Sequence, residues 1–138
     1  HFSAREFDVD AVVAMLQLEP SNVRRQGELS GRGKPLIKSI LSIIASEADF
    51  NSFKQQVVDV INFIKANRQD LCILRDLSLC LDDADLHFDF GLYTRMFKVA
   101  AQVDFLPAEL IKLCAEIGAG IMISQYPPSD EDEDDDED

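Results

Sequence analysis

An apolar stripe in the middle of the sequence sets the first limit on the fold. Apolar residues recur at helical spacing after Asp49, which is a predicted N-cap: Phe53, Val57, Val60, Ile61 and Ile64. A helix with one apolar face has to bury that face against another layer of structure. The chain has 138 residues, of which 46% are hydrophobic, and this length fits one domain with one core.

Strands are expected on both sides of this helix. Residues 88–92 and 97–105 alternate between apolar and polar with a short gap between them, which is typical of a hairpin. Residues 36–45 are almost continuously apolar and favour a central strand covered on both faces. Shorter strands are predicted at 2–7, 23–28 and 120–126.

Three further helices complete the expected order. Asp8 is a predicted N-cap for a first helix, and Pro107 and Gly118 mark the start and end of a last one. Residues 69–81 fit a helix or a strand, and we favour a helix. The fold class is therefore α+β, an antiparallel or mixed sheet with helices packed on it. A faint similarity between 7–13 and 105–111 fits two ferredoxin-like βαβ halves, or chance.

The end of the sequence has a different composition. Residues 130–138 are an unbroken run of nine acidic residues and supply most of the net charge of −13. Adjacent like charges repel one another and bury little surface, so a disordered segment is expected. Pro127 and Pro128 mark the boundary. We predict a single α+β domain over 1–126 and a disordered acidic tail over 127–138.

Charge is also clustered within the predicted domain. A glycine-rich loop carries the basic residues Arg24, Arg25, Arg32 and Lys34. An acidic cluster consists of Asp82, Asp83, Asp85 and Asp89. This cluster lacks the central Gly and terminal Glu of a calcium-binding loop, so we predict no metal site and interpret it as a partner-binding surface.

The sequence does not supply a catalytic set. His87 shares a strand face with Asp89, but no nucleophile is placed beside it, and a structural histidine is the favoured interpretation. The glycine-rich stretch 27–35 is not a phosphate-binding loop, because Glu28 and Pro35 stand where Gly and Ser or Thr are required. We therefore expect no enzyme activity, no catalytic residues and no cofactor.

Partners and location are constrained by composition. No aromatic residues lie among the basic ones and the pI is near 4.4, so direct binding to nucleic acid is not expected. No apolar run reaches the roughly 18 residues of a membrane span. The three cysteines, Cys72, Cys80 and Cys114, have no C-x-x-C spacing, which favours a reducing, cytoplasmic setting.

Several phrases together resemble one bacterial family, the domain of unknown function 4279. They are F-D-V-D-A-V-V-A-M-L-Q-L-E-P-S (7–21), R-R-Q-G-E (24–28), D-F-L-P-A-E-L-I-K-L-C-A-E-I-G-A (104–119) and I-M-I-S-Q-Y (121–126). The chain departs from the family pattern at Gln17 and Leu106 and has no Trp. The resemblance implies a small accessory protein, of which some act as immunity proteins beside secreted toxins.

Two functions remain open at this point. The first is a non-catalytic, acidic protein-binding domain of the immunity or antitoxin type, which neutralises a basic partner such as a toxin by charge and shape. The second is a regulatory or ligand-sensing module with a pocket between sheet and helices.

Overall fold

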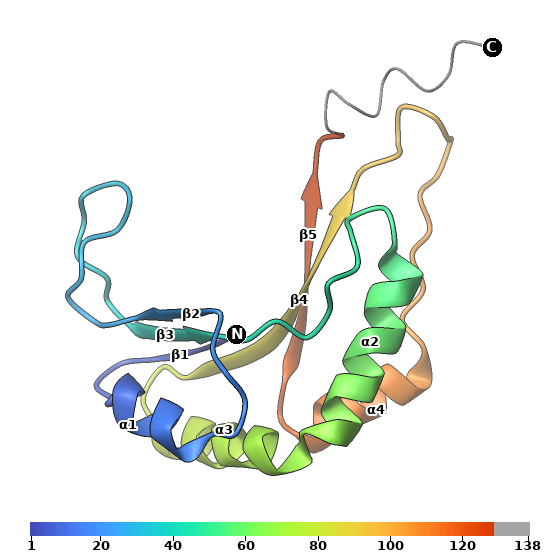
Figure 1. Cartoon of the computed structure of the whole chain (residues 1–138). Coiled ribbons are helices and arrows are strands. Elements are labelled where there is room, and N and C mark those ends of the chain that lie inside the picture. The colour runs from blue at the N-terminus through green and yellow to red at the C-terminus, as the bar shows by residue number, and fades with distance from the viewer. Residues whose placement is uncertain (129–138) are drawn as a thin grey trace.

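The computed structural model describes residues 1–128 (Figure 1). Its strands are β1 (Phe2–Ala4), β2 (Asn22–Arg24), β3 (Ser39–Ser42), β4 (Asp85–Tyr93) and β5 (Gly120–Tyr126). Its helices are α1 (Val9–Met15), α2 (Phe53–Ala66), α3 (Arg68–Cys80) and α4 (Ala108–Glu116). Residues 129–138, which make up most of the predicted acidic tail, lie outside the described residues.

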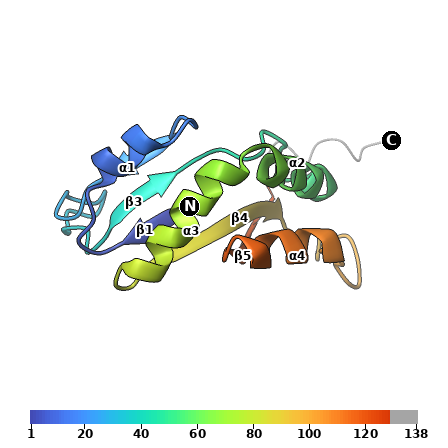
Figure 2. The ribbon, with the colours of Figure 1, turned by 90° about the horizontal axis from the view of Figure 1, so that it is seen from below.

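The strands form one mixed sheet in the order β2-β3-β1-β4-β5. β4 and β5 are parallel, and the other neighbours are antiparallel. Figures 1 and 2 show the helices on one side of this sheet, so its other face is uncovered. The predicted α+β class with a mixed sheet is confirmed, whereas the two ferredoxin-like halves are not.

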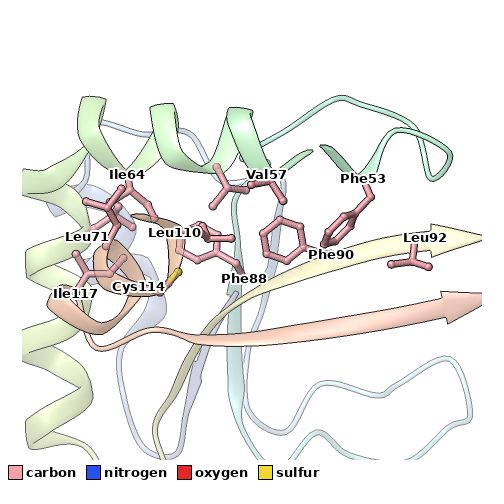
Figure 3. Packing of buried hydrophobic residues seen from close by; sticks show 12 residues of the cluster. Phe53, Val57, Ile64, Leu71, Phe88, Phe90, Leu92, Leu110, Cys114 and Ile117 are labelled. Atoms are coloured by element: carbon pink, nitrogen blue, oxygen red, sulfur yellow. The ribbon is translucent and has the colours of Figure 1, made fainter. Parts of the chain in front are cut away.

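The core lies between the sheet and the helices and has two parts, which meet along β4. Phe88 and Phe90 point from β4 towards α2 and α4 (Figure 3), and Leu92 belongs to the same buried cluster, as their alternation predicts. The second part packs α1 and α3 against β1 and β3, with Phe2 and Leu41 at its centre.

Local signals place the helix ends. The Asp8 carboxylate accepts a hydrogen bond from the Ala11 amide at 3.1 Å, so the predicted N-cap of α1 is confirmed. Gly118 follows α4 with a φ of 64°, a left-handed conformation that ends a helix. The second helix begins later than predicted, because Asp49 accepts from the Asn51 amide within a turn and α2 starts at Phe53.

The predicted hairpin is wrong. Residues 97–105 form no strand, and Val103 and Phe105 are 81% and 77% exposed. β4 pairs instead with β5, in parallel, through a crossover that contains α4. Alternation reports the faces of a strand but not its neighbour, and a parallel neighbour requires a long connection of this kind.

The predicted central strand at 36–45 is also shorter and differently placed. β3 covers only Ser39–Ser42, lies between β2 and β1, and has helices on one face. Residues 43–45 leave the strand and lead towards α2. Ile43, Ile44 and Ala45 line the cavity described below, although Ile44 is 59% exposed.

Candidate functional site

A cavity of about 370 Å³ opens in the middle of the molecule. It lies between β4, the connection from β3 to α2, and the two helices α2 and α3. The helices supply an apolar wall: Val60, Phe63, Leu71 and Leu74. His1, Ser42, His87 and Asp89 supply the polar groups at its other side. The cavity is therefore apolar towards the helices and polar towards the uncovered sheet face.

Two histidine rings stack at the edge of this cavity. The His1 and His87 rings lie 4.7 Å apart between centroids. His87 Nδ1 lies 3.0 Å from the Asp85 carboxylate, and Ser42 Oγ lies 3.5 Å from His1 Nδ1. The imidazole of His87 is therefore paired with Asp85 and not with Asp89, and the Ser42 hydroxyl lies beside the His1 ring.

The amino group of His1 is part of the same arrangement. It donates a hydrogen bond to the His87 carbonyl at 3.0 Å. Burial lowers the pKa of this amine, and the negative charges of Asp85 and Asp89 oppose that effect only in part.

The three cysteines do not supply an activated nucleophile. Cys114 is buried, and burial raises the pKa of its thiol to about 11, so the thiolate that would act as a nucleophile is disfavoured. Cys72 is half-buried and Cys80 is exposed. Within residues 1–128, no three His, Cys, Asp or Glu side chains gather as a metal site would require.

The structure separates the predicted acidic cluster into two pairs. Asp82 and Asp83 lie in the turn between α3 and β4, where the Asp83 carboxylate pairs with Arg5 at 3.3 Å and with Lys38 at 3.2 Å. Asp85 and Asp89 lie on β4 and point to the uncovered face of the sheet, where Asp89 accepts a hydrogen bond from the Ser124 hydroxyl at 2.7 Å. The charge of Asp83 is already balanced, whereas Asp85 and Asp89 face solvent.

Much of the charge in the basic loop is balanced within the molecule. Arg24 pairs with Glu28 at 2.9 Å. Arg25 pairs with Asp10 at 2.6 Å and with Glu28 at 3.2 Å. The hydrogen bond from Arg25 lowers the pKa of the Asp10 carboxyl, and the hydrogen bond from Arg24 is the main cause that lowers the pKa of the Glu28 carboxyl. Among the described residues, Arg32 and Lys34 are the members of the loop without an ion pair.

An aromatic cluster, Phe50, Tyr93 and Tyr126, lies on the uncovered face at the far end of β4 and β5. The Phe50 ring stacks on Tyr126 at 5.2 Å and meets Tyr93 edge-on at 5.4 Å. Gly91 makes room for it, because a Cβ there would lie 2.7 Å from Phe50 Cε1. The sequence did not predict this cluster, although a glycine inside a strand signals a close approach by another group.

The cluster continues along β5 into a mixed apolar and acidic surface. Met122 and Tyr126 are each 45% exposed, and Phe50 is 37% exposed. Met122 and Ser124 lie opposite Asp89 and Gly91 in the parallel register, so the apolar and acidic side chains share one face. We call this surface, made of Phe50, Asp85, Asp89, Tyr93, Met122 and Tyr126, the open face.

Fold and site together define a small α+β domain with one helical layer and an uncovered sheet face. The chain belongs to the family described as Domain of unknown function (DUF4279), whose model matches residues 1–128. The resemblance found in the sequence is thereby confirmed. No curated protein and no solved structure matches the chain. Between residues 1 and 128, no helix combines the length and apolar composition needed to cross a membrane.

Proposed function

We propose that this domain is a non-catalytic protein-binding domain of the immunity or antitoxin type, which neutralises a basic partner by charge and shape. The observation that carries the proposal is the open face, where Asp89 lies opposite the exposed Met122, Asp85 follows on the same face of β4, and the exposed aromatic cluster lies at the other end of the strand. Aromatic residues and Met are enriched at the centres of protein interfaces. Carboxylates around them favour a partner of opposite charge.

The charge of the whole chain supports the same kind of partner. The net charge of −13 attracts basic proteins over long distances and repels acidic ones. Specific contact then requires carboxylates that are free to pair. Asp85 contacts the His87 imidazole and Asp89 accepts from the Ser124 hydroxyl, but neither forms an ion pair with an Arg or Lys of the described residues, whereas Asp83 is already paired with Arg5 and Lys38. We therefore assign the contact to the open face rather than to the whole acidic cluster.

Affinity capture tests the proposal. The immobilised chain is exposed to a native cell extract at low and high salt, and retained proteins are identified by mass spectrometry. The comparison variants are Tyr126→Ala and Asp89→Asn on the open face, and Glu19→Gln, an exposed position in the connection between α1 and β2. We expect one basic protein that the first two variants lose and the third retains, and whose toxicity or activity the intact chain suppresses.

Two results would contradict this function. A captured protein that binds the open-face variants as tightly as the intact chain would place the contact elsewhere. A bound protein whose activity is unchanged by the domain would remove the neutralising role and leave binding alone.

A second function, a regulatory or ligand-sensing module, is favoured by the cavity. Its volume of about 370 Å³ lies within the range of roughly 300–1,000 Å³ that small-molecule pockets occupy. Equilibrium dialysis against a panel of small apolar acids and amides tests this function. Saturable binding that is lost in Leu74→Trp, which fills the helical wall of the cavity, would support a sensor.

A further inference from the structure

The two edge strands of the sheet differ in how well they suit pairing with another chain. The order β2-β3-β1-β4-β5 places β2 at one edge and β5 at the other. β2 has three residues and includes Arg24, and a short, charged edge resists pairing. β5 has seven residues, G-I-M-I-S-Q-Y, with no charged side chain and no proline. Of the two edges, β5 is therefore the one suited to pairing.

The pairing of β5 with β4 identifies its unused backbone groups. The Thr94 amide donates to the Tyr126 carbonyl at 2.9 Å, so the backbone groups of Tyr126 point towards β4. Successive residues of a strand point their backbone groups to opposite sides, so those of Ile121, Ile123 and Gln125 point away from β4. Among residues 1–128, no hydrogen bond uses these outward groups. The edge therefore presents the amide and the carbonyl of three residues.

Apolar side chains are exposed along this edge on both faces of the sheet. Met122 and Tyr126 are exposed on the open face. Ile123 lies opposite Phe90 in the parallel register and so faces the helix side, but it is 43% exposed. The helical layer therefore leaves the edge uncovered at Ile123.

Helix α4 extends the apolar surface on the helix side. Glu109 pairs with Lys65 at 2.6 Å, which marks the side of α4 that faces α2. Ile111 comes two positions later, roughly 200° further round the helix, so it is directed away from α2. Because α4 also packs against β5, the exposed Ile111 lies on the β5 side of the helical layer.

A second copy of β5 fits this edge in one antiparallel register. Residues whose backbone groups point outward lie opposite one another in such a pair, and each opposed pair exchanges two hydrogen bonds. With Ile123 opposite Ile123 of the second copy, Ile121 lies opposite Gln125, and all the outward groups are used. A shift of the register leaves at least one of these three residues without a partner in β5.

The same register places large side chains opposite small ones. On the open face, Tyr126 lies opposite Gly120 of the second copy, and Met122 lies opposite Ser124. An aromatic side chain across from an edge glycine is a favourable pair. No like charges oppose one another, because the strand has none. The strand is therefore complementary to itself, as the interface of a two-fold dimer has to be.

We propose that β5 is a dimerisation edge, at which two copies of this chain pair their β5 strands antiparallel about a two-fold axis at Ile123. The two sheets then form one continuous sheet. The helices of both copies lie on one side of it, and the two open faces lie next to each other on the other side. Pairing at the edge does not cover the open face, so this inference goes beyond the proposed function and does not depend on it.

Sedimentation velocity of the purified full chain tests the dimer. We expect a monomer–dimer equilibrium that depends on chain concentration. Each copy carries a net charge of −13, so salt screens the repulsion between the copies. The dimer dissociation constant should therefore fall at least about threefold between about 0.05 M and about 0.5 M salt. Binding to a basic partner has the opposite dependence on salt, which separates the two interactions.

A substitution at the two-fold axis tests the position of the contact. Ile123→Lys places two like charges opposite each other and should raise the dimer dissociation constant at least about tenfold. Leu79→Lys is the matched control, because it makes a similar exchange at an exposed position on α3. Equal effects of the two substitutions would overturn the proposal. A chain that stays monomeric at about 1 mM would also overturn it, and would leave the edge to a strand of another protein.

Cysteine cross-linking tests the register without relying on a destabilising charge. In a Cys80→Ser background, which lacks the exposed thiol, Ile123→Cys places two Cα atoms about 5.5 Å apart, within the range of a disulfide. Gln125→Cys is the control, because its two copies would lie about 13 Å apart along the strands. After mild oxidation, we expect a covalent dimer on a non-reducing gel from Ile123→Cys alone. Equal cross-linking of the two variants would rule out the two-fold axis at Ile123 and with it the proposal.

Discussion

Gly91 is the position on β4 where a side chain would displace an aromatic ring. A Cβ there would lie 2.7 Å from Phe50 Cε1, so Gly91→Ala has to move the ring away from Tyr126. We expect this substitution to lower the free energy of unfolding by about 1–3 kcal/mol, the usual cost of overpacking. Urea denaturation measures the loss, and the near-ultraviolet circular dichroism of the aromatic cluster should weaken with it.

Gly31→Ala is the matched control, because no atom lies within 4 Å of a Cβ at that position. It should change the free energy of unfolding by less than about 0.5 kcal/mol. Equal losses for the two substitutions would show that backbone freedom, and not the Phe50 ring, makes glycine necessary at Gly91.

Cys114 links stability to alkaline pH. Burial raises the pKa of its thiol from near 9 to about 11 in the folded state. Between these values the unfolded chain releases a proton that the folded chain keeps, so the thiol favours folding below pH 9 and this contribution is lost as the pH rises towards 11. Urea denaturation across this range should show a steeper loss of stability for the intact chain than for Cys114→Ala. Identical slopes would show that the thiol ionises equally in both states.

Single residues were predictable where their partner is near in sequence. Asp8 caps the helix that follows it, and Gly118 ends the one before it. Pairings between distant residues were not predictable, because sequence spacing carries no information about them. Asp83 meets Arg5 and Lys38 only after the sheet has formed, and this pairing divides what the sequence presents as one acidic cluster.

Substitutions in α2 test how this helix packs, because its apolar face forms part of the main core. Ile64 is fully buried and Ile61 only half-buried at the margin. We expect Ile64→Ala to cost about 2–5 kcal/mol and Ile61→Ala less, because a cavity opens only where the neighbours enclose the side chain. Leu79→Ala on α3, where the side chain is 80% exposed, is the control and should be nearly neutral. Thermal and urea unfolding measure all three, and a larger cost at Ile61 would mean that the helix is rotated.

Elements were predictable to the extent that they depend on local periodicity. α2 and α4 follow from apolar spacing at 3.6 residues, and β4 follows from alternation. The spacing at 69–81 fits a helix or a strand, and the structure shows the favoured helix, α3. The neighbours of β4 were not predictable, because alternation at 97–105 is equally compatible with a paired strand and with the exposed connection that the structure contains. The open face escaped prediction for the same reason, since it depends on β5 lying beside β4.

Charge acts at the scale of the whole molecule, and the acidic run 130–138 allows its role in stability to be measured separately. Deletion of residues 129–138 removes nine negative charges. We expect the Tm to stay within a few degrees at moderate salt, because adjacent like charges bury little apolar surface. Differential scanning calorimetry measures the change. A loss above about 2 kcal/mol would contradict the expectation and would point to docking on the basic loop.

The charges of the chain should affect the association rate and the dissociation rate of a partner differently. Screening shortens the reach of a charge from about 30 Å at 0.01 M salt to about 10 Å at 0.1 M, so association with a basic partner should slow by a decade or more across that range. Deletion of residues 129–138 should mainly slow association, because a run of like charges acts at long range. Asp85→Asn with Asp89→Asn should mainly raise the dissociation rate, because these carboxylates have fixed positions on β4.

Surface plasmon resonance across a salt series separates the two rates, with Glu19→Gln as the control for loss of a charge away from the open face. Salt-independent association, together with unchanged dissociation in the Asp85 and Asp89 variants, would show that electrostatics does not hold the complex. The aromatic cluster would then have to carry the binding energy, and Tyr126→Ala should abolish capture while both rates remain insensitive to salt. Which of these variants loses binding therefore shows whether charge or apolar contact on the open face selects the partner.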